Sequence, residues 1–342
     1  MSGAVSTHFE LHFGAGRTIR RMILAADVGG SKTFVGLFAR EHPRPRLLQV
    51  HTMRTLDFPG LPELLREAVG TLDPRVDAVS LGVAGPILGG VATMTNVPWR
   101  VSGAEISAAT GVADVRLLND LEAMAHAVTV LQADELHTLQ AGRPSPTGNA
   151  ALIAAGTGLG EAILHRVDGR MRPVPSEAGH SDFAARTDDE LALVVELKAR
   201  FGRVDIEHVL SGPGMVNIAR HTHGASHCAV AGDLEAHGAA ARVSDVGAPG
   251  CARCAAAVRL FVAAYGAEAG NLALRALASA GVYIGGGIAP KMLAELQEGA
   301  FLTAFGDKPP MAALLADVPV HVILNAQAGL VGAAVAALDP RS

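Results

Sequence analysis

The segment Asp27–Thr33 combines a carboxylate, a glycine turn and a hydroxyl directly after the apolar run Met22–Ala26. Glycines in a tight turn expose backbone N–H groups that can bind the oxygens of a polyphosphate, and a carboxylate can hold the water shell of its Mg²⁺ ion. The segment is not a Walker A loop, and a plain strand–turn–strand hairpin is the alternative. The residues that would bind the phosphates, with Asp27 contacting Mg²⁺ through water, are Asp27, Gly29, Gly30, Ser31 and Lys32.

Two further glycine clusters follow apolar strand patterns. The first follows residues 150–155 and the second follows residues 281–284. One such cluster is typical of an ordinary tight turn. Three in one chain predict two phosphate-binding turns and a flat backbone surface for a purine. The residues of these two clusters are Gly156, Thr157, Gly158, Gly285, Gly286 and Gly287.

Asn119 and Asp120 stand at the end of an expected strand, where a helix begins. Open α/β sheets place ligands at the carboxyl ends of their strands. Phosphoryl transfer to an alcohol needs a base that takes the hydroxyl proton. The pair therefore predicts a general base, Asp120, beside an amide that hydrogen-bonds the alcohol. The alternative is that Asp120 is an ordinary helix N-cap.

The turn Pro175–Phe183 carries Glu177, His180 and Asp182 within a few residues. Donors and acceptors held on a stiff turn suit a polyol substrate. A metal site made of these three residues and a simple hydrogen-bonded loop are the alternatives. Glu207 precedes the segment 209–214 and is a weaker candidate, since a glutamate on a helix face is usually solvated.

The elements that must position these residues form two similar cycles, because residues 22–40 and 150–166 both give strand, glycine turn and strand. This repetition indicates a duplicated α/β unit with a nucleotide between the copies. Residues 140–149 are expected to form a loop, and 221–250 a mobile surface excursion. Strands are expected over 22–28, 33–40, 46–53, 78–84, 91–95, 114–118, 150–155, 161–166 and 281–284, and helices over 61–71, 103–110, 120–130, 189–200, near 205–221, 251–279, 290–298 and 327–338.

Composition narrows the class of protein. The 342 residues are 49% hydrophobic and 4% aromatic, which is typical of a packed α/β globule. The net charge of −5 indicates no nucleic-acid-binding surface. No apolar stretch is long enough to cross a membrane, and the first 21 residues lack the apolar core of a secretory signal. A cytoplasmic location is therefore expected.

The cysteines are Cys228, Cys251 and Cys254, too few for a disulfide framework and suited to a reducing compartment. Cys251 and Cys254 have the spacing of metal ligands, but no second such pair follows to complete a zinc site. The favoured interpretation is that both thiols open the long helix and face its neighbours. Histidines that a metal could recruit are nearby, namely His221, His223, His227 and His237.

In combination these motifs resemble the bacterial glucokinases, which belong to the hexokinase branch of the actin-like ATPase folds. The similarity runs in the family's order from residue 22 to residue 332. The matching stretches are LAADVGGSKT, MTNVPW, LLNDLEAMA, AGTGLGEA, PSEAGHSDF, HVLSGPGMVNIAR, CARC, NLAL, GGVYIGGGIAPK, FLTAFGDK and GLVGAA.

The resemblance implies a two-lobed α/β fold of the actin-like ATPase (ribonuclease H-like) type, with the ligand cleft between the lobes. It implies an N-terminal extension over 1–21, a small lobe over 22–130 completed by a C-terminal helix within 325–342, and a large lobe over 131–324. The implied reaction is the first step of glycolysis, the transfer of a phosphoryl group from ATP with Mg²⁺ to the 6-hydroxyl of glucose. A homodimer is common in the family.

The resemblance also implies roles for single residues. Asp120 matches the catalytic base, and the residues that match sugar-binding positions are Asn96, Asn119, Glu177, His180 and Glu207. Asp27, Gly29, Gly30 and Ser31 match the first phosphate loop, and Gly156, Thr157 and Gly158 match the second. The turn on the adenosine side is matched by Gly285, Gly286 and Gly287. Gly212 is expected near the purine base of the nucleotide.

Three positions depart from the family pattern. Lys32 stands where these glucokinases often carry Asn, and Ser176 and Ala178 replace a more glycine-rich turn. Alternative functions are a kinase of another hexose, such as mannose, fructose or an N-acetylhexosamine, a sugar-sensing regulator and an actin-like structural ATPase. A regulator would need a DNA-binding domain, and the 21 leading residues are too short for a helix-turn-helix.

Overall fold

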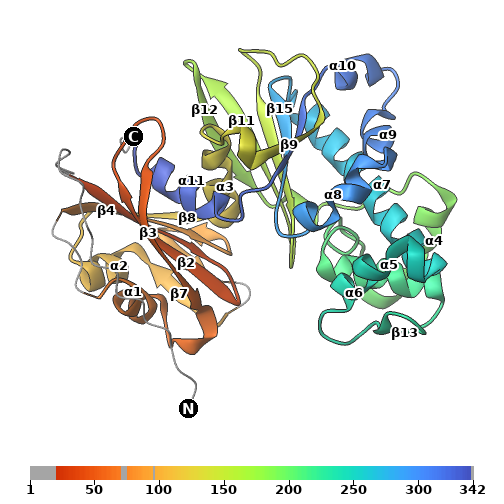
Figure 1. Ribbon diagram of the computed structural model, residues 1–342, viewed down its shortest axis with the longest axis horizontal. Helices are drawn as coiled ribbons and strands as arrows, with labels where there is room; N and C mark the ends of the chain where they lie inside the picture. The colour runs from red at the N-terminus through yellow and green to blue at the C-terminus, as the bar shows by residue number, and fades with distance from the viewer. Residues whose placement is uncertain (1–20, 71–74, 95–96, 340–342) are drawn as a thin grey trace.

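The computed structural model describes residues 21–70, 75–94 and 97–339 (Figure 1). Residues 1–20 of the predicted extension over 1–21, Asn96 and the last three residues lie outside the described residues. Within the described ranges, no helix combines the length and apolar character needed to cross a membrane.

The first of two large sheets has the strand order β3-β2-β1-β4-β8. Strand β1 pairs antiparallel with β2 and parallel with β4, which in turn pairs parallel with β8. The same half of the molecule contains two helices, α1 (Leu61–Val69) and α2 (Gly103–Thr110). It also contains a small sheet of three strands, β5 (Ile87–Leu88), β6 (Val91–Thr93) and β7 (Arg100–Ser102). The strands of the large sheet are β1 (Met22–Val28), β2 (Lys32–Ala39), β3 (Arg46–Arg54), β4 (Val76–Val83) and β8 (Val115–Asn119).

The second large sheet has the order β12-β11-β10-β15-β16-β9. Its strand β10 pairs antiparallel with β11 and parallel with β15, as β1 does with β2 and β4. The expected duplication of strand, glycine turn and strand is therefore confirmed. The strands are β9 (Leu136–Gln140), β10 (Ala150–Ala155), β11 (Leu159–Val167), β12 (Arg170–Ser176), β15 (Gly281–Gly285) and β16 (Val320–Ile323).

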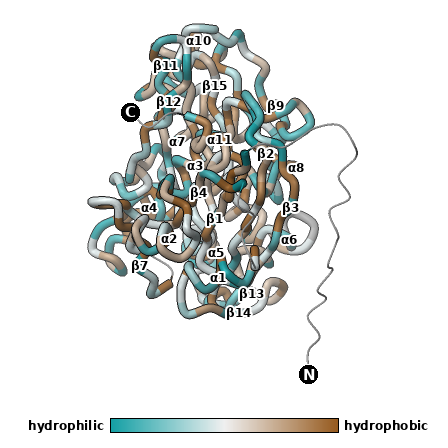
Figure 2. The backbone as a smooth tube through the Cα atoms, turned by 90° about the vertical axis from the view of Figure 1, so that its left-hand side faces the viewer, coloured by the Kyte–Doolittle hydropathy of each residue, from teal (hydrophilic) through white to brown (hydrophobic). Residues whose placement is uncertain are grey.

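Alternation along β1 explains how its sheet is covered. Leu24 and Ala26 belong to the core that includes α1 and α2, whereas Ile23 and Ala25 belong to the core that includes α11 (Ala328–Ala336). Since successive strand residues point to opposite faces, an apolar run of this kind is buried on both sides. In Figure 2 such apolar residues are brown.

Helices α3 (Asp120–Val128) and α11 lie between the two sheets (Figure 1). Ala123 and Leu330 pack in the core under β1, while Ala125 and Val331 pack in the core that contains residues of β10. The two helices contact each other closely at Gly332, where a side chain would meet the carbonyl oxygen of Ala123. A helix pair with small residues at its contact therefore joins the two halves.

The remaining helices cover the far face of the second sheet (Figure 1). The long helix α7 contacts α5, α6 and α9, and a short hairpin of β13 (His227–Cys228) and β14 (Gly232–Asp233) lies near α5. The helices are α4 (Asp188–Phe201), α5 (Gly212–His223), α6 (Ala239–Gly250), α7 (Ala252–Ala276), α8 (Leu293–Gln297), α9 (Ala300–Gly306) and α10 (Ala312–Ala316), and the 3₁₀ turns are η1 (Thr55–Asp57), η2 (Ala133–Glu135), η3 (Ala178–His180) and η4 (Ala289–Met292).

Three sequence-based expectations are wrong. Of the helices expected near 205–221 only α5 forms, and it begins at Gly212, because Ser211 is its N-cap and accepts a hydrogen bond from the Gly214 N–H. The helix expected over 290–298 divides into η4 and α8. Residues 221–250 are not a surface excursion, since they form the end of α5, the hairpin of β13 and β14, and all of α6, with Leu234 and Val243 in the core.

Candidate active site

Asp27, Asn119 and Asp120 lie at the carboxyl edge of three adjacent strands. Val28 of β1 pairs with Val83 of β4, and Val83 pairs with Asn119 of β8. The strands are parallel, so their carboxyl ends meet at one edge of the sheet. The strand order thus brings together side chains that are more than ninety positions apart in the sequence.

Helix α3 begins at Asp120, and its N-cap is Asn119. The Leu121 N–H donates to Asn119 Oδ1 and to Asp120 Oδ1, each at 2.9 Å, and Asn119 Nδ2 donates to the Gly85 carbonyl at 3.3 Å. The alternative that Asp120 is an ordinary N-cap is therefore wrong, because the N-cap residue is Asn119. Asp120 is held at the first helical residue.

Burial raises the pKa of both carboxyl groups at this edge. The pKa of Asp27 rises to about 7, mainly by burial and further by the charge of Asp120. Burial also raises the pKa of Asp120, as does the charge of Glu177, while the Leu121 N–H lowers it. The charge of Asp120 therefore acts on Asp27, and that of Glu177 acts on Asp120. A general base works best when its pKa approaches the working pH.

The turn between β1 and β2 is braced by Thr55, a buried residue that the sequence patterns did not single out. Its hydroxyl donates to the Gly29 carbonyl at 2.8 Å, and its N–H donates to the Ser31 carbonyl at 3.1 Å. The Lys32 ammonium lies 4.3 Å from the centre of the Phe34 ring. Only the three-dimensional fold brings Thr55, from the end of β3, against this turn.

The turn between β10 and β11 contacts the start of α5. The Gly156 carbonyl accepts from the Gly212 N–H at 2.8 Å, and the Gly156 N–H donates to the Gly158 carbonyl at 2.8 Å. A cavity of about 590 Å³ opens beside Thr157 and the first turn of α5. Gly212 therefore lies beside the second glycine turn.

The third glycine cluster lies next to the second because β15 is the parallel neighbour of β10. Gly286 has a positive φ of 82° and packs directly on the backbone of Ala155, an approach that excludes a side chain. Gly287 faces open space, since no atom lies within 4 Å of the position that its Cβ would take. Two of the three clusters thus share one edge of the second sheet.

Glu207 connects the second glycine turn with the turn of Glu177 and His180. Its carboxylate accepts from the Leu159 N–H at 2.8 Å, and a Cβ on Gly158 would lie 2.5 Å from that carboxylate. Its own N–H donates to the Gly179 carbonyl at 3.0 Å. The structure therefore brings Glu207 to both candidate sites.

His180 lies on η3 and is half-exposed, with its Nδ1 3.5 Å from Asp205 Oδ2. Arg203 donates to the His180 carbonyl at 2.8 Å and to the Asp182 carboxylate at 2.6 Å. Since Asp182 pairs with Arg203, the alternative of a metal site made from Glu177, His180 and Asp182 finds no support. The turn presents its polar groups from a braced backbone.

Helix α3 brings Asp120 to the second sheet. Gly160, two residues beyond Gly158, leaves room for the Leu121 side chain, and Gly285 leaves room for Met124. The catalytic candidate Asp120 therefore lies at the start of a helix that contacts both sheets. The turn of Gly29–Lys32 belongs to the first sheet and the other glycine clusters to the second, so a nucleotide that contacts all of them must span both sheets.

The chain is similar to known proteins over most of its length. A family model described as glucokinase matches residues 24–340. A glucokinase of Synechocystis sp. is 36% identical over 92% of this chain and 97% of its own, and one of Chromobacterium violaceum is 38% identical over 93% and 91%. The crystal structure of a glucokinase from an Antarctic psychrotroph has a TM-score of 0.81 at 31% identity, and it covers 92% of this chain and 98% of its own.

Proposed function

Since the chain belongs to the glucokinase family, and accordingly phosphorylates glucose with ATP, we propose that Asp120 is the base that takes the proton from the 6-hydroxyl of glucose. The fold is the predicted two-lobed α/β fold of the actin-like ATPases. Nothing in the comparisons favours a kinase of another hexose or a sugar-sensing regulator.

The observation that carries the proposal is the place of Asp120. Its carboxyl group is partly buried at the carboxyl edge of the first sheet with a raised pKa, and the adjacent Leu121 contacts the strand that follows the second glycine turn. As Asp120 takes the proton, the sugar oxygen bonds to the γ-phosphorus, and the bond from that phosphorus to the β–γ bridging oxygen breaks. ADP and glucose 6-phosphate are the products.

The sugar hydroxyls would be held by side chains on both sides of Asp120. Asn119 precedes it, and Glu177 is near enough to raise its pKa. Glu207 is hydrogen-bonded to the same turn as Glu177 and His180. We assign these four side chains to glucose binding, together with Asn96.

The phosphates would be bound by the backbone N–H groups of the glycine turns. Gly29, Gly30, Ser31 and Lys32 form the first turn, and Gly156, Thr157 and Gly158 the second. Gly212 and the cluster Gly285–Gly287 would lie on the adenosine side. The shared edge of β10 and β15 and the hydrogen bond from Gly212 to Gly156 support this assignment.

The acidic edge fits a Mg²⁺ ion. Burial, and further the charge of Asp120, raise the pKa of Asp27 to about 7, and a divalent cation bound by oxygen ligands would relieve the repulsion between the two carboxylates. We assign Asp27 to holding Mg²⁺ through its water shell. The bound ion would neutralise charge on the phosphates.

We place the enzyme in the cytoplasm because its reaction consumes ATP and its three cysteines form no disulfide, as is usual in a reducing compartment. A homodimer is our proposal for its assembly. Light scattering tests the assembly, since a monomer has a mass of 35.1 kDa and a particle of this mass would contradict a dimer.

The experiment that tests the base is Asp120→Asn beside the matched control Asp189→Asn, an exposed residue in the first turn of α4. ADP release is measured with MgATP and with glucose, mannose, fructose or N-acetylglucosamine, and glucose binding is measured by calorimetry. Asp120→Asn should lower turnover by about 10²–10⁴-fold and retain glucose binding, while the control matches the wild type. Turnover within about tenfold of the wild type would remove Asp120 from this role.

A further inference from the structure

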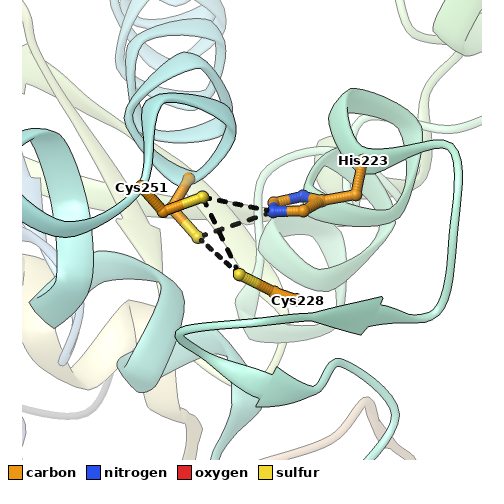
Figure 3. A group of neighbouring side chains, drawn as sticks. His223, Cys228 and Cys251 are labelled. Carbon is orange, nitrogen blue, oxygen red and sulfur yellow. Dashed lines mark hydrogen bonds between the residues drawn. The ribbon is translucent and has the colours of Figure 1, made fainter.

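A cluster of sulfur and nitrogen atoms lies at the C-terminal end of α5, opposite the end that contacts the second glycine turn. His223 is the last residue of α5, Cys228 is in β13, and Cys251 caps α7 with Cys254 in its first turn. Figure 3 shows His223, Cys228 and Cys251 pointing toward one another from three different elements. Their ligand atoms, with that of Cys254, all lie within 4.8 Å of one another.

Four of the six separations between these atoms match a tetrahedron around zinc. With Zn–S near 2.3 Å and Zn–N near 2.05 Å, a regular tetrahedron has S···S edges of about 3.8 Å and S···N edges of about 3.6 Å. Cys228 Sγ lies 3.8 Å from Cys251 Sγ and 3.7 Å from Cys254 Sγ. His223 Nε2 lies 3.6 Å from Cys251 Sγ and 3.8 Å from Cys254 Sγ. One ion at the centre could therefore reach all four atoms with little movement.

Hydrogen bonds around the cluster prepare the ligands. His223 Nδ1 lies 2.7 Å from the Ala219 carbonyl oxygen, which can only accept, so Nδ1 donates and Nε2 presents its lone pair to the sulfurs. A hydrogen bond of this kind commonly orients a metal-binding histidine. The N–H groups of Val230 and Ala231 donate to Cys228 Sγ at 3.4 and 3.3 Å. They favour the thiolate, which is the form that binds a metal.

A disulfide explains this geometry less well. A sulfur–sulfur bond is about 2.05 Å long, whereas Cys228 lies almost equally far from both other thiols. Pairing two thiols would also leave the third thiol and the buried histidine without a role. Three thiolates and one imidazole are a ligand set typical of closed, structural zinc sites.

We propose that His223, Cys228, Cys251 and Cys254 bind one structural zinc ion. The ion would tie the end of α5 to the start of α7 and hold the hairpin of β13 and β14 against both. The opposite end of α5 donates the Gly212 N–H to Gly156, so the ion would fix the helix that supports the second glycine turn. The proposal is independent of which sugar the enzyme uses.

Metal analysis of the full chain, purified without chelators from zinc-supplemented cells, tests the proposal. The wild type should carry about one zinc per chain, and Cys228→Ser and His223→Ala should each carry less than about a tenth of that. His223→Cys supplies a fourth thiolate and should keep the ion. His227→Ala is the matched control, because this exposed histidine adjoins Cys228 and is not among the four ligands.

A measurement on the wild type alone keeps the proposal testable if the variants fail to fold. Removal of the metal by a strong chelator should lower the thermal midpoint and make all three thiols react with a thiol reagent, and zinc but not Mg²⁺ should reverse both effects. Cobalt added instead should give the visible bands of tetrahedral thiolate coordination. A wild type that holds no stoichiometric transition metal, or that holds one equally well in Cys228→Ser, would overturn the site, and a different stoichiometric metal would overturn its assignment to zinc.

Discussion

At the scale of single residues, Glu161 on β11 is a carboxyl group inside the second half of the molecule. Burial and the charge of Glu268 raise its pKa to about 8, and Arg275 only partly offsets this. The Arg275 guanidinium bonds Glu268 at 2.6 Å but lies 3.8 Å from Glu161. At neutral pH the folded enzyme therefore keeps a proton on this pair of carboxyl groups.

Glu161→Gln should make the enzyme more stable at alkaline pH. The pKa in the folded state is about 8 against the ordinary glutamate value of 4.5, so the folded state binds more protons than the unfolded state between these values. Wild-type stability then falls as pH rises through this window, by at most about 1.4 kcal/mol per pH unit. Thermal midpoints of the variant and the wild type should agree near pH 4.5 and diverge toward pH 8. A constant difference across this range would contradict the raised pKa.

Residue types and spacing predicted the candidate site residues more readily than the residues that contact them in the fold. Asp120 and the glycine clusters could be proposed because each follows an apolar strand pattern. Thr55, which braces the first turn, and Cys228, which meets Cys251 and Cys254, carry no comparable local pattern. Their neighbours are distant in sequence, so only the packing of the elements identifies them.

At the scale of elements, helix α11 contacts the acidic edge of the first sheet at Gly329, which lies against the Asp27 carboxylate. A Cβ on Gly329 would lie 2.5 Å from Asp27 Oδ2 and 2.8 Å from its Cγ. The start of α11 therefore limits where the Asp27 carboxylate can lie. Helix position and the proposed Mg²⁺ contact are thus coupled.

Gly329→Ala should impair catalysis by displacing Asp27. Added volume in a packed contact costs about 1–3 kcal/mol, and a misplacement of about 1 Å at a reacting centre can cost about 10²-fold in rate. Gly306→Ala is the matched control, because this glycine ends α9 with no atom within 4 Å of the position of the new Cβ. Steady-state kinetics at several Mg²⁺ concentrations and thermal unfolding are the measurements. Wild-type kinetics in Gly329→Ala would show that Asp27 does not need its present position.

The strands that sequence patterns missed are short or lie at sheet edges. Strand β12 contains two prolines and is mostly exposed, and β16 has 4 residues. Neither strand shows a long alternation of apolar and polar residues. An edge strand such as β12 is partly exposed to solvent, and a short central strand such as β16 is held by hydrogen bonds to its two neighbours. Residues 221–250 appeared irregular from their glycines and histidines, and their order comes from packing against α5 and α7.

At the scale of the whole molecule, the two large sheets share a strand order around a common pair of helices. Positions β3-β2-β1-β4-β8 correspond to β12-β11-β10-β15-β16. This symmetry sets one hairpin of strand, glycine turn and strand in each sheet, with α3 and α11 between the sheets. The assignment of residues 22–130 and 325–342 to one lobe and 131–324 to the other follows this arrangement and stays a prediction.

Ligand binding should make the enzyme more compact. The turn of Gly29–Lys32 and the turn of Gly156–Gly158 lie on different sheets, so a nucleotide bound by both should draw the lobes together, which would also exclude water from the transferred phosphate. A compact chain of 342 residues has a radius of gyration of about 20 Å, and an open two-lobed chain exceeds this value.

Small-angle X-ray scattering of Asp120→Asn, which should bind its ligands without consuming them, measures this change. The radius of gyration should fall toward the compact value when glucose and MgATP are added together. ATP without glucose should have a smaller effect, because the sugar-binding side chains come from both halves of the molecule: Asn119 from the end of β8, and Glu177 and His180 from the turn after β12. Identical scattering with and without glucose, under conditions where calorimetry shows the sugar to be bound, would mean that the site is already assembled before the substrate arrives.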